Sequence, residues 1–164
     1  QPSNGGRPTM LGPVQREWLK RTIADSKGTF TVLVSPVPWV FGAKGDSKDT
    51  WNGFKSERKE IFEVIRESRK DGVLLMSADR HRSDLWKIEH QGIYPLYEFN
   101  SSRLTNQHVH PELQAAEFSY NKKQSFGLVE FDTKIQDPTV EYSVINIDGK
   151  VIHNRKLKRS EISY

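Results

Sequence analysis

The chain has 164 residues, of which 35% are hydrophobic and 28% are charged, and its net charge is +4. This composition is typical of a folded domain with a core, and so small an excess of positive charge does not indicate a nucleic-acid-binding protein. The sequence has no cysteine, which excludes disulfides, thiolate metal ligands and a cysteine nucleophile. The longest apolar runs, such as residues 73–76, are far too short to cross a membrane.

The beginning of the chain suggests that it is part of something longer. It starts at Gln1 without an initiator methionine, and no basic segment followed by an apolar run marks an export signal. Residues 1–8 are rich in glycine and proline, so we expect a flexible lead-in there. We expect a fragment or a processed chain, with part of the function encoded upstream.

Residues 9–83 have the pattern of an α/β unit. Gly12-Pro13 opens a helix that residues 26–28 close, and a continuously apolar run at 29–34 predicts a buried strand. A second helix is expected over about 56–70 and a second buried strand over 73–76. The order helix, strand, helix, strand predicts a mostly parallel sheet. The side chains expected in its core are Trp18, Ile23, Leu33, Ile65 and Leu75.

Residues 84–164 have the pattern of antiparallel β structure. His90-Gln91-Gly92 and Asp148-Gly149 are expected to be hairpin turns, the second of type I′. The polar stretch at 100–124 has no assignable pattern. The basic cluster at 155–159 is typical of a solvated edge strand. The predicted strands cover residues 84–89, 93–99, 125–131, 140–147 and 150–157.

The sharpest chemical pattern is Ser77-Ala78-Asp79-Arg80-His81, directly after the buried strand at 73–76. Sites in open α/β sheets form at the carboxyl ends of strands. Asp79 and His81 can enter one crevice from a tight turn, and their oxygen and nitrogen atoms are good ligands for zinc, iron or manganese. The guanidinium of Arg80 or Arg82 suits a phosphate oxygen. The alternative is a capped turn with a surface ion pair.

Three other features are open to two interpretations each. Ser35 ends the strand at 29–34 and would reach the same crevice if the two buried strands are neighbours, although a simple strand-ending turn is favoured. His108-Val109-His110 has the alternate spacing of metal ligands, but in a polar loop solvated histidines are the favoured interpretation. The aromatic segment 51–54 could be a lid over a ligand or a staple on the following helix.

Six motifs between about Thr9 and Ile162 resemble, in their order and spacing, the C-terminal part of the PhoD-like phosphatases. This family, also called alkaline phosphatase D, belongs to the calcineurin-like metallophosphoesterases. The resemblance implies that the chain is the C-terminal half of a four-layer α/β/β/α sandwich. The motifs are Leu11-Gly12 with Gln15 and Trp18-Leu19; Trp51-Asn52-Gly53-Phe54; Ser77-Ala78-Asp79-Arg80-His81; Tyr94-Pro95-Leu96-Tyr97-Glu98 with Ser101-Ser102; Ser125-Phe126-Gly127-Leu128; and Asp148-Gly149-Lys150.

The resemblance also implies a site with two metal ions that bind phosphate and activate a water or hydroxide, and the candidate ions are Fe, Zn, Mn and Ca. It places Asp79 and His81 on the last metal-binding motif of the family, where Ala78 replaces a glycine. Ser35 falls where many relatives in the wider superfamily carry a metal-binding histidine. Arg80 is the expected contact to the phosphate of the substrate.

The upstream motifs that supply the remaining ligands are not in this chain. The resemblance therefore implies hydrolysis of phosphate mono- or diesters only together with the N-terminal half of the same protein, in a periplasmic or secreted location. The alternative is a non-catalytic, metal-depleted relative that holds a phosphorylated ligand through Arg80 and Arg82. A nucleic acid as a stable partner is disfavoured.

Overall fold

The computed structural model describes residues 3–4 and 7–164, and its first part follows the predicted order of elements. Helix α1 (Gly12–Asp25) and strand β3 (Thr31–Val34) are followed by helix α2 (Lys55–Glu67) and strand β5 (Val73–Ser77). Strands β3 and β5 are parallel neighbours, which confirms the predicted parallel α/β unit. Between β3 and α2 lie the short strand β4 (Ala43–Asp46) and one turn of 3-10 helix.

The flexible lead-in predicted for residues 1–8 falls partly on residues outside those described. In the described part, the two-residue strands β1 (Ser3–Asn4) and β2 (Arg7–Pro8) pair antiparallel.

Five strands form a mixed sheet in the order β3-β5-β7-β6-β8. Strand β7 (Leu96–Ser101) runs parallel to β5, and β6 (Ser83–Ile88) pairs antiparallel with β7, as the predicted hairpin requires. Strand β8 (Phe118–Tyr120) pairs with β6 and lies in the stretch that the sequence left unassigned. The carboxyl ends of the parallel strands β3, β5 and β7 therefore lie together on one side of the sheet.

Three strands form a second, antiparallel sheet in the order β11-β10-β9, namely β9 (Ser125–Asp132), β10 (Thr139–Asn146) and β11 (Val151–Lys158). The hairpin at Asp148-Gly149 is confirmed, but its predicted type I′ turn is wrong. Gly149 has a positive φ of 75° and Asp148 does not, whereas a type I′ turn needs both. A register shift at Val144–Ile145 accommodates the extra residue of this longer turn.

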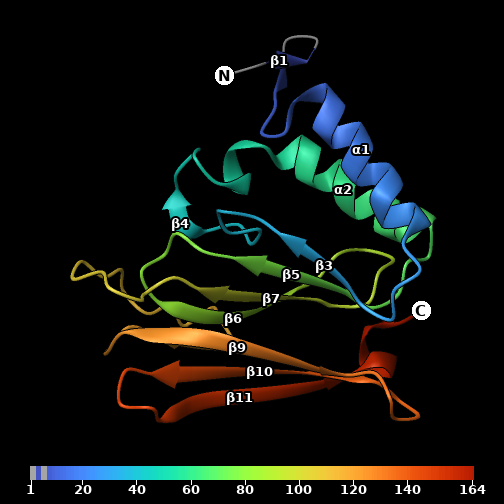
Figure 1. The fold of residues 1–164 in the computed structure, drawn as a ribbon. Helices are drawn as coiled ribbons and strands as arrows, with labels where there is room; N and C mark the ends of the chain where they lie inside the picture. Colours follow the sequence, from blue (N-terminus) through green and yellow to red (C-terminus); the bar gives the residue numbers. More distant parts are fainter. Residues whose placement is uncertain (1–2, 5–6) are drawn as a thin grey trace.

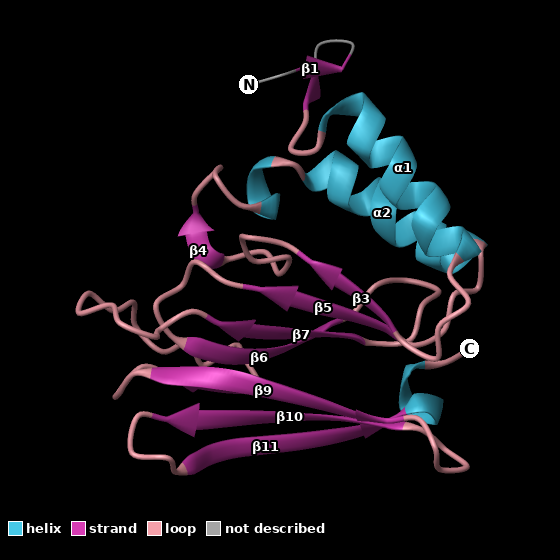
Figure 2. Ribbon diagram, viewed as in Figure 1, coloured by secondary structure: helices cyan, strands magenta, loops and turns pink. Residues whose placement is uncertain are grey.

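The two sheets and the helices form three layers. Figures 1 and 2 show α1 and α2 on one side of the five-stranded sheet and the three-stranded sheet on the other. Between the sheets, Tyr142 of β10 stacks on Phe99 of β7 with ring centroids 4.5 Å apart, and its hydroxyl donates to the carbonyl of Asn100. A second helical layer, as in the expected four-layer sandwich, is not found among the described residues.

Most of the predicted core is confirmed, and one residue of it is wrong. Ile23, Leu33, Ile65 and Leu75 are buried, but the side chain of Trp18 is 54% exposed. The physical reason is that β3 is an edge strand, so no further strand lies beside it under α1. A groove of about 480 Å³ remains between α1 and β3. Its lining includes Leu11, Trp18, Leu19, Val32, Val34 and Trp39.

Candidate metal and phosphate site

The turn that follows β5 holds two residues in an unusual backbone conformation. Asp79 and His81 have positive φ values of 65° and 48°, in the left-handed region that costs a residue with a side chain about 1–3 kcal/mol. Ala78, between them and the strand, has no positive φ, so a methyl group is accommodated there without backbone strain.

The end of β7 and the residue after it stabilise this strained turn. The hydroxyl of Ser102 accepts hydrogen bonds from the backbone N–H groups of Arg80 and His81 at 2.8 and 2.9 Å. The side-chain amide of Asn100 donates to the carbonyl of Ala78 at 3.0 Å. Because Asn100 is fully buried, the turn is fixed to the interior of the sheet while the Asp79 side chain is left at the surface.

The carboxylate of Asp79 has one long ionic contact. Its Oδ2 lies 3.5 Å from Nζ of Lys44, and the same ammonium group lies 2.6 Å from Asp49. The hydrogen bond from Lys44 to Asp49 is the main reason that the pKa of Lys44 is raised. Lys44 is therefore engaged mainly with Asp49, and the exposed Asp79 carboxylate has lone pairs free for a cation.

The ring of His81 is oriented by two neighbours in the loop that follows β7. Its Nδ1 lies 3.1 Å from the carbonyl oxygen of His108, and its Nε2 lies 3.3 Å from the amide nitrogen of Asn106. A carbonyl oxygen can only accept a hydrogen bond, so Nδ1 carries the proton in this arrangement. The lone pair of Nε2 then accepts a hydrogen bond from the side-chain amide of Asn106, and a ligand at Nε2 would replace that contact.

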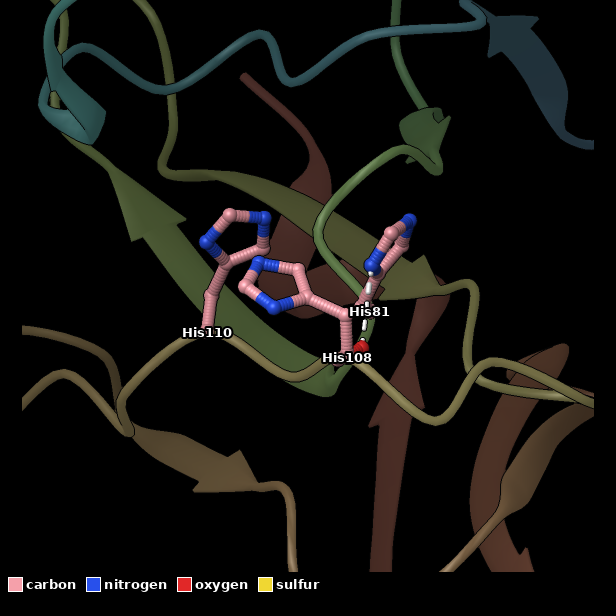
Figure 3. Close-up of side chains that lie close together, drawn as sticks. All are labelled: His81, His108 and His110. Atoms are coloured by element: carbon pink, nitrogen blue, oxygen red, sulfur yellow. Dashed lines mark hydrogen bonds between the residues drawn. The ribbon is translucent and has the colours of Figure 1, made fainter.

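The same loop brings two more histidines to His81. One nitrogen of each of His81, His108 and His110 can be chosen so that all three lie within 4.8 Å of one another (Figure 3). Solvated histidines were expected at 108 and 110, and their grouping with His81 was not predicted. His108 is exposed, as expected, but His110 is half-buried. Their alternate spacing was the available signal, but nothing in the loop showed that it folds back over the turn.

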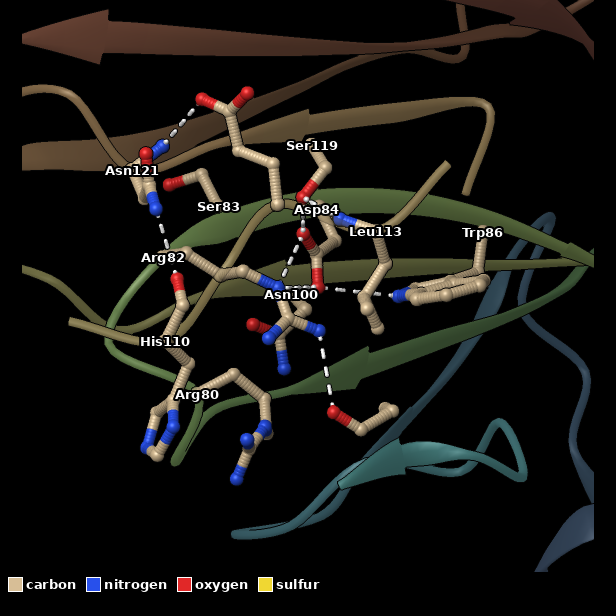
Figure 4. Close-up of polar contacts among 12 residues, drawn as sticks. Arg80, Arg82, Ser83, Asp84, Trp86, Asn100, His110, Leu113, Ser119 and Asn121 are labelled. Atoms are coloured by element: carbon tan, nitrogen blue, oxygen red, sulfur yellow. Dashed lines mark hydrogen bonds and ion pairs between the residues drawn. The ribbon is translucent and has the colours of Figure 1, made fainter. Parts of the chain in front are cut away.

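The two arginines of the turn have different environments. Arg80 and Arg82 are both buried residues, but Arg82 donates from Nε to both oxygens of Asp84 at 2.8 Å. Nε of Arg80 has no hydrogen-bond partner, and burial is the main cause of the lowered pKa of Arg80. Figure 4 shows the side chains of Arg80 and His110 pointing away from Asp84. Arg82 is thus a structural residue, and Arg80 retains donor capacity.

Ser35 directly follows the carboxyl end of β3, as expected, but its hydroxyl already makes hydrogen bonds within the protein. Its Oγ donates to the carbonyl of Val37 at 2.7 Å and accepts from Nε1 of Trp51 at 3.0 Å. Trp51 is 1% exposed and stacks on Trp39 at 4.5 Å. Phe54 is also buried, so the aromatic segment acts as a staple of the core rather than a lid.

Comparison with known proteins agrees with this architecture. A family model described as PhoD-like phosphatase matches residues 1–153. The chain belongs to the PhoD-like phosphatase family. Alkaline phosphatase D of Bacillus subtilis (strain 168) is 27% identical to it over 81 residues, which cover 46% of this chain and 14% of that protein.

A solved structure of PhoD superposes with a TM-score of 0.61 at 16% identity, covering 90% of this chain and 32% of that one. At this identity the likeness shows the shared fold. This PhoD-like chain therefore spans about a third of the solved protein and a smaller share of the curated relative. In the part of the chain that the structure describes, no helix has the length and apolar character needed to cross a membrane.

Proposed function

We propose that this chain supplies the C-terminal part of a metal-dependent phosphatase or phosphodiesterase. The observation that carries the proposal is the turn after β5, where Asp79 and His81 are both held with positive φ at the carboxyl end of a parallel strand. Strain of this kind persists only where surrounding contacts fix it, and it is concentrated at functional sites. Its support from Ser102 and Asn100 is what a pair of fixed ligands requires.

The donor atoms of this turn fit the metal ions on which PhoD-like phosphatases depend. Asp79 would offer a carboxylate oxygen and His81 its Nε2 lone pair, to a centre of Fe, Zn, Mn or Ca. When bound, such ions polarise a phosphoryl oxygen and lower the pKa of a bound water. Ser35 is the less favourable third ligand, because its hydroxyl would have to give up its contacts with Trp51 and Val37.

Arg80 is proposed to contact the phosphate of the substrate. Its unpartnered Nε is a donor that an anionic oxygen would satisfy, and a charge-assisted bond of this kind is stronger than a neutral one. Arg82 cannot share this role, since its Nε is bound to Asp84 and one of its terminal nitrogens to the carbonyl of Ala43. The alternative of a non-catalytic cradle built from both arginines is therefore not favoured.

The remaining ligands are proposed to come from the N-terminal half of the same protein. The relatives that match are much longer than this chain, and two good ligands do not hold two ions. The open edge of β3 and the apolar groove beside it give that half a place to dock. The chain alone is expected to be inactive, and a periplasmic or secreted location is proposed for the whole protein.

The proposal is tested in the longer protein that contains this chain. Asp79→Asn and His81→Ala should each remove most of the hydrolysis of a phosphate ester and lower the bound metal measured by elemental analysis. His90→Gln is the matched control, because that histidine lies in a distant hairpin turn against Glu63. Full activity and unchanged metal content in both site variants would contradict the proposal.

A further inference from the structure

We propose that His108 and His110 join His81 in binding one divalent ion of the zinc type, at a three-imidazole site that the loop between β7 and β8 completes. The inference shares His81 with the proposed function and deepens it, whereas the other two ligands are independent of it. The candidate ligand nitrogens all lie within 4.8 Å of one another. Around a tetrahedral zinc ion, nitrogens at bond lengths of about 2.0–2.1 Å lie about 3.3 Å apart, so small side-chain rotations close the site.

A hydrogen bond ties the loop to the strained turn. Nδ1 of His81 lies 3.1 Å from the backbone carbonyl oxygen of His108. This contact holds the ring of His81 beside the loop that carries the other two histidines (Figure 3).

The loop that carries His108 and His110 is anchored to the buried interior. The side-chain amide of Asn121 donates to the carbonyl of His110 at 2.9 Å. A few residues on, the backbone of Leu113 donates to the hydroxyl of Ser119, which in turn donates to the buried carboxylate of Asp84 at 2.6 Å (Figure 4). These contacts restrict the loop before any ion binds, which lowers the cost of forming the site.

The charges around the site affect which ligand can complete it. Burial is the main cause of the lowered pKa of His110, and the nearby positive charge of Arg80 lowers it further. The charge of Arg80 also opposes a bare cation, and an anion in the open fourth position would offset that repulsion.

The donor set selects the ion. Imidazole nitrogens suit zinc and the later transition metals, whereas calcium takes oxygen ligands. The carboxylate of Asp79 is not part of the histidine group. The proposed site should therefore prefer Zn²⁺ or Co²⁺ over Ca²⁺, irrespective of which ions the rest of the centre takes.

The test uses the metal-stripped longer protein, titrated with Zn²⁺ alone and with Co²⁺ as a spectroscopic substitute. X-ray absorption at the zinc edge should show three imidazole nitrogens at the tightest site. His108→Ala and His110→Ala should each weaken zinc binding there by at least about tenfold, since loss of a mere outer partner of a metal ligand already costs that much. His90→Ala is the control and should keep the three-nitrogen signal.

The outcomes separate this inference from the proposed function. If both loop variants fold by circular dichroism and keep wild-type zinc affinity and coordination, the three-imidazole site is overturned, even where Asp79→Asn abolishes hydrolysis. If the loop variants lose zinc while the unaltered protein hydrolyses no phosphate ester, the site stands and the proposed function fails.

Discussion

Arg80 and Arg82 lie two residues apart, and their side chains have different hydrogen-bond environments. The sequence predicted that Arg80, inside the turn, is the one available to phosphate and that Arg82 leads into the next strand. Arg82 is paired with the buried Asp84 and Nε of Arg80 has no partner, whereas the contact between Arg80 and phosphate stays a prediction. This contrast could be predicted because the turn separates the two residues, whereas the partner of Arg82 required knowledge of the fold.

The first prediction at this scale concerns transition-state binding. Arg80→Ala should lower kcat/KM of the longer protein for a phosphate ester and leave the metal content intact. The fall should correspond to a loss of about 1–3 kcal/mol of transition-state binding, the value of a charge-assisted contact. Steady-state kinetics with elemental analysis of the same samples checks it. An unchanged kcat/KM would mean that the phosphate is bound by residues of the other half.

The second prediction concerns stability. Arg82→Ala should destabilise the protein by about 3–5 kcal/mol, because it leaves the charge of Asp84 buried without its partner. Denaturant unfolding measures this loss. The double variant Arg82→Met with Asp84→Leu removes both charges and should recover most of it. If the double variant is no more stable than Arg82→Ala, the ion pair is not the reason for the loss.

At the scale of elements, the helices and strands could be predicted and the loops could not. The bounds of α1, α2, β5 and β9–β11 agree with the sequence to within a few residues, because apolar periodicity and turn residues mark them. The stretch at 100–124 contains β8 and the histidine loop, which are held by side-chain contacts with Asp84 and Asn121 that have no sequence pattern. The predicted burial of Trp18 was wrong, because burial of a helix residue depends on which element lies opposite it.

The aromatic staple gives a prediction at this scale. A Cβ at Gly53 would collide with the backbone carbonyl of Lys48, so Gly53→Ala must displace the segment that places Trp51 against Trp39. Gly149→Ala is the control, since its Cβ meets nothing and only the positive φ opposes it, at about 1–2 kcal/mol. Thermal unfolding should show a larger loss for Gly53→Ala. A smaller loss than in the control would contradict the described packing.

At the scale of the whole molecule, the open side of β3 is the main feature that a complete protein has to cover. Strand β3 is hydrogen-bonded to β5 alone in the described sheet, and Val34 and Trp18 are 76% and 54% exposed beside the groove. Unpaired strand edges and exposed apolar patches promote association. This agrees with a chain that spans about a third of the solved PhoD.

The chain expressed by itself should therefore associate and bind a hydrophobic dye. Val34→Lys should reduce both effects, because a charge on an edge strand discourages pairing. Val14→Lys is the control, since that residue is 84% exposed on α1 and does not line the groove. Sedimentation velocity over a range of concentrations measures association. A monomeric, cooperatively melting chain that binds no dye would show that the edge needs no partner.

The central claim is that the turn after β5 holds metal ions of a phosphatase site, and anomalous X-ray diffraction from crystals of the longer protein tests it most directly. Data collected at the iron, zinc and manganese edges locate each ion independently of any activity. We expect an anomalous peak at about 2.0–2.3 Å from a carboxylate oxygen of Asp79 or from Nε2 of His81. Metal peaks elsewhere in the protein, with neither residue in contact with an ion, would contradict it.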